Sequence, residues 1–187
     1  MQKIYIITTY TGTALSYLIR NISKTPYAHV SIALNKDLRP MYSFGRLNPK
    51  TPLFAGFVEE NINEGLYAIK TNTRCRVYSL YVTNEQYNNL YKNILNVSEN
   101  RDKYDYDVLA LIYLSRNKPR EAEYKYVCSH FVADMLDQSG IKLFDQPPYA
   151  IRPNDFFNHK DLTLEYEGLL SAYRAKEKIF EYTLSSI

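Results

Sequence analysis

Residues 125–140 read KYVCSHFVADMLDQSG, and this stretch predicts a helix with a cysteine close to its start. Apolar side chains recur along it at helical spacing, which places them on one face. They are Phe131, Val132, Met135 and Leu136. Gly140 is a typical stop signal, because glycine readily adopts the conformation that ends a helix. The apolar face is therefore expected to pack on a sheet.

Four segments have the composition of β-strands. Residues 3–9, KIYIITT, are rich in β-branched and aromatic side chains. Residues 28–35, AHVSIALN, alternate between two faces, with His29 near the start. The turn signal NKDLRP separates them from MYSFGR at 41–46, so the two segments predict a hairpin. RCRVYSLYV at 74–82 alternates in the same way and predicts a further strand.

Two further helices are expected in the middle of the chain. Residues 83–97 begin with Thr83 three positions before Gln86, a capping-box pattern, and continue with apolar side chains at helical spacing. Residues 106–114 predict a second helix. A short helix is also expected after Thr11, where Leu15, Leu18 and Ile19 have helical spacing.

The remaining segments complete a mixed architecture. Residues 47–66 contain two prolines and two glycines, and we expect them to be irregular. Residues 162–173 predict one or two late strands. No internal repeat or low-complexity linker divides the chain. The order of elements predicts a single α+β domain over residues 1–187.

Composition limits the classes of function. The chain has 23 basic and 20 acidic side chains with interspersed signs, and its net charge is only +3. A nucleic-acid-binding protein would show a basic stripe, so this class is not expected. The two cysteines and three histidines lack metal-ligand spacing, and we expect no metal and no cofactor.

The sequence also predicts a compartment. The first 20 residues have neither the basic start and apolar core of a signal peptide nor a small-residue cleavage site. No stretch approaches the length of a membrane span, so no stable membrane insertion is expected. We therefore expect a cytoplasmic protein with reduced thiols.

Cys128 is the candidate nucleophile because it stands where the predicted helix begins. The first backbone N–H groups of a helix and its dipole stabilise a thiolate, the reactive form of cysteine. The same N–H groups can hold the oxyanion that forms when a thiolate attacks a carbonyl. The alternative is an inert buried cysteine, which is common in proteins.

Elimination among the three histidines selects a base for this thiol. His159 lies in the polar stretch FFNHKD and is expected at the surface. His130 is two positions after Cys128, and side chains at this spacing do not face each other on a helix. His29 remains as the group that takes the thiol proton and returns it to a leaving group.

Two motifs carry a family resemblance. YAHVSIALN followed by MYSFGR resembles the His-bearing hairpin of NlpC/P60-like enzymes, and YVCSHFVADML resembles their Cys-bearing helix. In ordinary members the Cys helix comes first, whereas here His29 precedes Cys128 by 99 residues. That order is similar to the permuted group, which includes YiiX-like proteins and relatives of lecithin:retinol acyltransferase. The resemblance implies a papain-like fold, in which an antiparallel sheet packs against the Cys-bearing helix.

The resemblance also implies further site residues. A polar residue on the strand after the histidine orients its ring, and the matching position here is Ser43, where the family more often has His, Asn, Gln or Glu. Glu59 and Glu60 in GFVEEN are the fallback candidates. Ordinary members also have a tyrosine that lines the oxyanion site, and Tyr104 or Tyr106 is available for that role.

The expected function is that of a thiol hydrolase or acyltransferase that cleaves an amide, isopeptide or ester bond. The alternative is a catalytically weak or inactive binding module that has kept the fold, since a fold does not fix a function. A peptide, a lipid amide and a muropeptide all fit as the substrate. The sequence fits all three substrates equally well, and it contains no signal for an oligomeric state.

Overall fold

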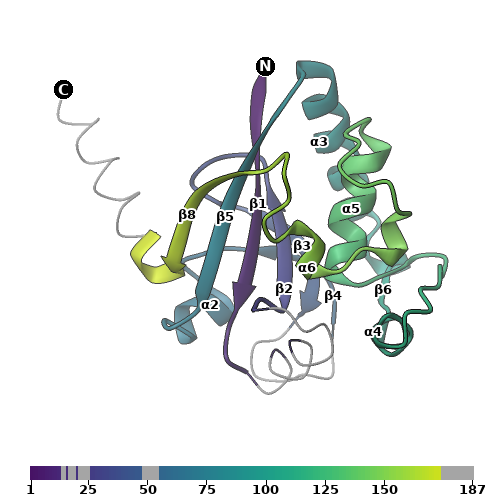
Figure 1. Ribbon diagram of the computed structural model, residues 1–187, viewed down its shortest axis with the longest axis horizontal. Helices are drawn as coiled ribbons and strands as arrows, with labels where there is room; N and C mark the ends of the chain where they lie inside the picture. The colour runs from purple at the N-terminus through teal and green to yellow at the C-terminus, as the bar shows by residue number, and fades with distance from the viewer. Residues whose placement is uncertain (14–15, 17–19, 21–25, 48–54, 174–187) are drawn as a thin grey trace.

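The computed structural model describes residues 1–13, 16, 20, 26–47 and 55–173 and has an α+β architecture built on a six-stranded antiparallel sheet (Figure 1). The strands of this sheet are β1 (Gln2–Tyr10), β2 (His29–Ala33), β3 (Met41–Arg46), β4 (Ala55–Glu60), β5 (Arg74–Val82) and β8 (Thr163–Leu169). Their spatial order is β4-β3-β2-β1-β5-β8. The N-terminal strand is therefore central, and it pairs with β2 on one side and β5 on the other.

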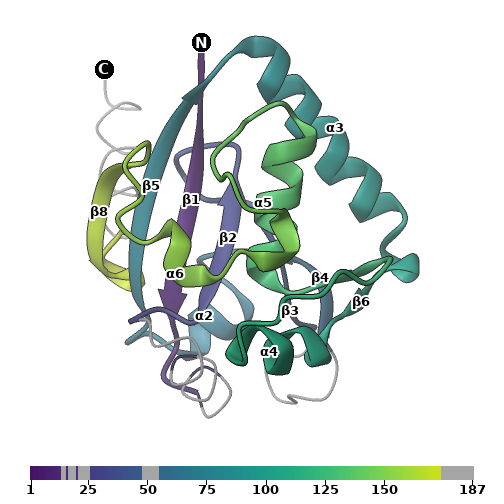
Figure 2. The same cartoon turned by 45° about the vertical axis from the view of Figure 1, so that its right-hand side comes forward.

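Helices and short elements surround the sheet. They are α2 (Gly65–Ile69), α3 (Asn84–Glu99), α4 (Val108–Ser115), α5 (Cys128–Gln138), α6 (Pro153–Phe156), the single-turn helices at Arg101–Lys103 and Pro148–Ala150, and the parallel pair β6 (Asp105–Tyr106) and β7 (Lys125–Tyr126). Figures 1 and 2 show α3 and α5 together on one face of the sheet.

Both faces of the central strand are buried. Ile4 and Ile6 belong to the core that α3 and α5 cover. Tyr5 and Ile7 point to the opposite face, where a second core includes Tyr67 of α2. A strand that is buried on both faces reads as a continuous apolar run, and KIYIITT has this character.

The helix α5 has the predicted position and the predicted buried face. Phe131, Val132, Met135 and Leu136 are all almost completely buried. The Phe131 ring lies 5.3 Å from that of Phe44 on β3 and 5.7 Å from that of Phe57 on β4, measured between ring centroids. These aromatic contacts fix the N-terminal half of α5, and with it Cys128, against the sheet.

Most predicted elements are confirmed. The hairpin forms between β2 and β3, and α3 begins with the capping box at Thr83 and Gln86. The helix predicted at 106–114 is α4, and the late strand is β8. The helix predicted after Thr11 lies largely outside the described residues.

The expectation of an irregular segment at 47–66 is wrong for part of it. Residues 55–60 form β4, which pairs with β3 from Met41 to Arg46, and residues 65–69 form α2. Gly56 is tolerated because it stands opposite Gly45, where the two strands need no side chains. Glycine predicts a break only when tertiary pairing does not hold the strand.

In the part of the chain that the structure describes, no helix is both long and apolar enough to cross a lipid bilayer.

Replacing Phe131 tests how far the fold depends on the packing of α5. Phe131→Ala removes a fully buried ring among Phe44 and Phe57 and is expected to lower the free energy of unfolding by about 3–5 kcal/mol. Urea unfolding followed by circular dichroism gives this quantity. Tyr91→Ala on α3 is the control, because the Tyr91 side chain is 49% exposed and its loss is expected to cost less than about 0.5 kcal/mol. Equal effects of the two changes would contradict the assigned packing.

Candidate active site

Cys128 is the first residue of α5, and Val127 is the N-cap. No side chain caps this helix, and its first turn holds no acidic residue. The first-turn N–H groups are thus free of a side-chain acceptor and face the thiol with a partial positive charge. The hydroxyl of Ser129 donates a hydrogen bond to the carbonyl of Ile151 at 2.6 Å, which anchors the start of the helix.

His29 is the first residue of β2, and its ring is held by a carboxylate. The Nε2 atom lies 3.0 Å from Oε1 of Glu60, the last residue of β4. The hydroxyl of Ser31 lies 3.2 Å from the same nitrogen and donates to Oε2 of Glu60. With Nε2 donating to Glu60, Nδ1 is the nitrogen that remains for the thiol of Cys128.

A chain of hydroxyls supports Glu60 from the opposite side. Tyr67 of α2 donates to Oε2 of Glu60 at 3.4 Å, and its own oxygen lies 3.3 Å from the hydroxyl of Thr9 on β1. A buried carboxylate that accepts several hydrogen bonds keeps its charge. The pKa of Glu60 is accordingly lowered: burial opposes this, but the charge of His29 and the hydrogen bonds from His29, Ser31 and Tyr67 prevail.

The electrostatics of His29 connect it to Cys128. Burial alone lowers the pKa of the imidazole, whereas the charge of Glu60 and the interaction with Cys128 raise it. The raising effects prevail, and the pKa of His29 is about 10. His29 and Cys128 therefore interact in the folded chain, although 99 residues separate them in the sequence. With a pKa of about 10, the His29 ring carries a positive charge at neutral pH.

Gly45 provides room for the histidine ring. Gly45 stands on β3 beside the start of β2, and a β-carbon there would lie 3.4 Å from Cε1 of His29. That distance is an ordinary van der Waals contact, so a β-carbon would just touch the ring and a larger side chain would compete with it for this space. The glycine in MYSFGR thus has a positional role at the site.

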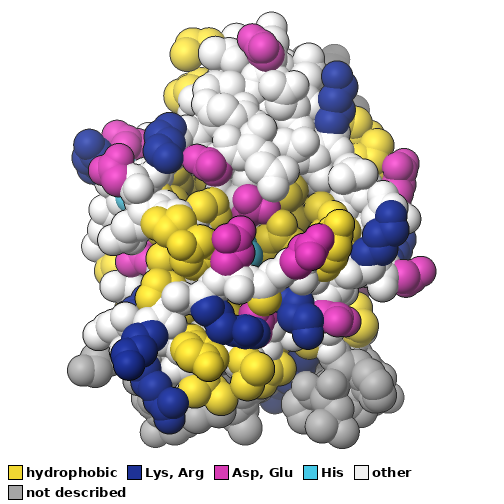
Figure 3. Space-filling view, turned by 90° about the vertical axis from the view of Figure 1, so that its right-hand side faces the viewer, with side chains coloured by type: hydrophobic (Ala, Val, Ile, Leu, Met, Phe, Trp, Pro, Cys, Tyr) yellow, Lys and Arg dark blue, Asp and Glu magenta, His cyan; other side chains and the backbone are white. Residues whose placement is uncertain are grey.

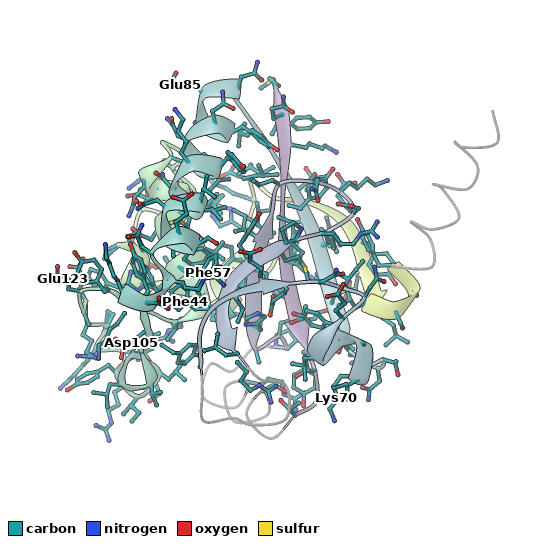
Figure 4. All side chains as sticks on the ribbon, turned by 180° about the vertical axis from the view of Figure 1, so that it is seen from behind. Phe44, Phe57, Lys70, Glu85, Asp105 and Glu123 are labelled. Carbon is teal, nitrogen blue, oxygen red and sulfur yellow. The ribbon has the colours of Figure 1, made fainter. Side chains whose placement is uncertain are left out.

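The three residues open onto a cleft of about 970 Å³. Its lining includes His29, Glu60 and Cys128, together with aromatic residues of β3, β4 and β6. Figure 3 shows the face that bears α3 and α5, where apolar side chains gather in the middle between acidic and basic groups. Figure 4 labels Phe44 on β3, Phe57 on the edge strand β4 and Asp105 on β6, and all three line the cleft.

Of the two candidate tyrosines, Tyr106 fits the expected place at the oxyanion site better than Tyr104 does. It lines the cleft, and its pKa is raised first by burial and then by the charge of Cys128, whereas Arg46 acts in the opposite direction. Tyr104 instead packs in an aromatic cluster, with ring centroids 5.6 Å from Tyr124 and 5.9 Å from Tyr126. Tyr106, unlike Tyr104, therefore lines the same cleft as Cys128.

Ser43 does not hold the orienting position predicted for it. The strand register does put it on the His29 face, but its hydroxyl donates to the backbone carbonyl of Val30 at 2.7 Å. Glu60, one of the two fallback candidates, occupies that position. Glu59 points to the other face of β4 and accepts a hydrogen bond from Ser98 at 2.9 Å.

The remaining candidate groups lie apart from this constellation. His130 packs on Tyr126 with ring centroids 4.5 Å apart, and burial lowers its pKa. Nδ1 of His159 accepts from the backbone of Asp161 at 3.3 Å. Burial and the charge of Glu167 raise the pKa of Cys75 to about 12, so this thiol stays protonated. Among the described residues, no three His, Cys, Asp or Glu side chains gather as a metal site.

No protein-family model matches the chain, and no curated protein matches it.

Removing the Glu60 charge should change the titration of His29. In a Cys128→Ala background, Glu60→Gln is expected to bring the pKa of His29 to 6.5 or below, because burial then acts without a compensating anion. The chemical shifts of the ring protons against pH give the value. Ser43→Ala is the matched control: it loses a hydrogen bond worth about 1 kcal/mol but leaves the histidine titration unchanged. An unaltered pKa in Glu60→Gln would show that the carboxylate does not act on the ring.

The same pair predicts how stability depends on pH. The pKa of His29 is raised on folding, so its contribution is complete below 6.5 and is lost as the pH rises toward about 10. The pKa of Glu60 is lowered, so its contribution is complete above 4.5 and is lost as the pH falls through the folded value. The difference in unfolding free energy between the wild type and Glu60→Gln should therefore be largest between pH 4.5 and 6.5. A difference that does not vary between pH 4 and 10 would contradict an ionised pair.

Proposed function

We propose that this chain is a thiol hydrolase or acyltransferase that cleaves an amide, isopeptide or ester bond through Cys128. One observation carries the proposal: the first residue of a helix is a cysteine that shares a cleft with a histidine and raises its pKa, and a carboxylate holds the ring of that histidine. This is the arrangement of nucleophile, base and orienting group that acyl transfer requires.

Each group has a definite role in the proposed reaction. The Cys128 thiolate attacks the carbonyl carbon, and the oxyanion is held by the first N–H groups of α5 and by the hydroxyl of Tyr106. The imidazolium of His29 donates its Nδ1 proton to the leaving group, which leaves a thioester on Cys128. Neutral His29 then takes a proton from water or another acceptor, and the deprotonated acceptor attacks the thioester carbonyl. The acyl group leaves bonded to the acceptor, Cys128 leaves as the thiolate, and the starting thiolate and imidazolium are restored. Glu60 keeps the ring in place and stabilises its positive charge throughout.

The papain-like, permuted NlpC/P60 assignment belongs to the same proposal. The two motifs that resemble the family lie on the elements that the resemblance implies: a hairpin, β2–β3, and a helix, α5, that packs on the sheet. The third group differs, because it comes from β4 instead of β3. The hydrogen bond and ion pair from Glu60 to His29 favour the enzyme over the binding-module alternative, because groups with strongly shifted pKa values gather at functional sites.

The substrate stays open within this proposal. A cleft of about 970 Å³ is large enough for a peptide, a lipid amide or a muropeptide. Both cysteines are free thiols, which suits the reducing compartment expected from the sequence.

Alkylation distinguishes an activated Cys128 from an ordinary thiol. Iodoacetamide should modify Cys128 with a rate that reaches its plateau below the ordinary cysteine pKa of about 8.5. Cys75 is the internal control, because its pKa of about 12 and its burial keep it unreactive in the folded protein. Intact mass and peptide mapping from pH 5 to 9 follow both sites. If Cys128 also reacts with a midpoint near 8.5, the binding-module alternative is favoured.

Substitution of the two reacting residues tests the mechanism. Cys128→Ser should abolish turnover with little change in stability, because the two side chains are close in volume and the hydroxyl is far less acidic. His29→Ala should lower the rate about 100-fold or more, because no other described group is placed to carry the proton. Turnover of a 4-nitrophenyl ester gives the rates, and thermal unfolding checks that the variants are folded. Wild-type rates in either folded variant would exclude the proposed roles.

A further inference from the structure

Arg46 is a cationic side chain in the catalytic cleft that the proposed mechanism does not use. It is the last residue of β3, directly after Gly45, and its side chain lines the same cleft as Cys128 and His29. Its Nη2 donates to the hydroxyl of Thr13 at 3.1 Å, which holds the guanidinium at a defined place. Burial removes part of the water around the guanidinium of Arg46 and thereby lowers its pKa.

Arg46 has no acidic partner among the described residues. Burial is the main influence on its pKa, and the hydroxyls of Tyr67 and Tyr106 are the further groups that act on it. By contrast, Arg76 pairs with Glu167 at 2.8 Å, and Arg120 pairs with Asp107 at the same distance. A half-buried guanidinium without a carboxylate is unusual, because buried charges are normally paired.

Tyr106 connects this charge to the nucleophile. The pKa of its hydroxyl responds to Cys128 in one direction and to Arg46 in the other, so the phenol lies near both groups. No described residue accepts or donates a hydrogen bond at this hydroxyl, and Tyr106 lines the cleft together with Arg46 and Cys128. A ligand bound at Cys128 therefore has a cation and a free hydroxyl donor within its reach.

We propose that Arg46 and Tyr106 bind a carboxylate of the substrate, so that the enzyme acts on acyl groups that carry a carboxylate a few atoms from the reacting carbonyl. Guanidinium is the side chain best suited to this task, because its planar set of N–H donors matches the two oxygens of a carboxylate. Only one of these donors is used by Thr13. This inference depends on the proposed thiol chemistry and adds the chemical class of the substrate.

Matched esters separate the two proposals. The anionic probe is the mono-4-nitrophenyl ester of glutarate, and the neutral probe is 4-nitrophenyl valerate, which has the same chain length without the carboxylate. In each case the Cys128 thiolate attacks the ester carbonyl, 4-nitrophenolate leaves with the bonding electron pair, and a thioester remains on Cys128. Nitrophenolate absorbance gives the rate, and intact mass gives the adduct. The succinate and butyrate pair repeats the comparison with a shorter chain.

The wild type is expected to react about tenfold faster or more with the anionic ester than with the neutral one, as charge-assisted hydrogen bonds allow. Arg46→Met keeps much of the side-chain volume and should reduce this ratio to about one. Arg46→Lys should retain part of it, because the charge remains without the planar donor set. Arg116→Met removes an exposed arginine outside the cleft lining and should leave the wild-type ratio.

The outcomes that overturn the inference are distinct from those that overturn the thiol chemistry. If neither ester acylates Cys128, the proposed function fails and the inference with it. If both esters acylate the wild type at equal rates for both chain lengths, the function stands and carboxylate recognition is excluded. A preference for the anionic ester that persists in Arg46→Met excludes Arg46 as its source.

Discussion

The buried ion pair between His29 and Glu60 is the interaction on which the site depends. Two charges removed from water are retained only when their attraction and their hydrogen bonds offset the loss of hydration. Here the hydroxyls of Ser31 and Tyr67 donate hydrogen bonds to the carboxylate of Glu60, and the Tyr67 hydroxyl is hydrogen-bonded to that of Thr9. These side chains come from β1, β2, β4 and α2, so the pair forms only when four separate elements are in register. A shift of one residue in any of the strand pairings would turn the polar group away from its partner.

Cys128 is positioned by a different kind of force. Its position follows from the apolar face of α5 and from the anchor between Ser129 and Ile151. Apolar packing on the sheet fixes the helix, and the helix then presents its N-terminus beside the start of β2. The site thus combines a polar half, specified by hydrogen bonds, with a half specified by the close packing of side chains such as Phe131.

The sequence was sufficient for the elements with strong periodicity, and it singled out Cys128 and His29, which line the same cleft. Local pattern identifies α5, the hairpin and the capping box of α3, and the position of Cys128 at a helix start suggests its chemistry. Glu60 was harder to place, because prolines and glycines nearby indicate a loop and a carboxylate in a loop is usually solvated. The alternation of Gly56, Val58 and Glu60 on one face is the signal that a strand is present, but only the pairing with β3 shows that this face meets His29. Ser43 was assigned from its place on the expected strand, yet a short hydroxyl is satisfied more readily by the nearby backbone.

The chain order of these parts has a consequence for a protein that emerges from the ribosome one residue at a time. The base, its carboxylate and their hydroxyl partners all occur within the first 67 residues, whereas the thiol comes at position 128 and its helix ends at 138. The central strand also needs β5, at 74–82, before both of its edges are covered. A nascent chain therefore keeps Cys128 apart from His29 and Glu60 until α5 has been synthesised and docked. The thiol and the ion pair come together only when the core is complete, so unfinished or misfolded copies lack the assembled site.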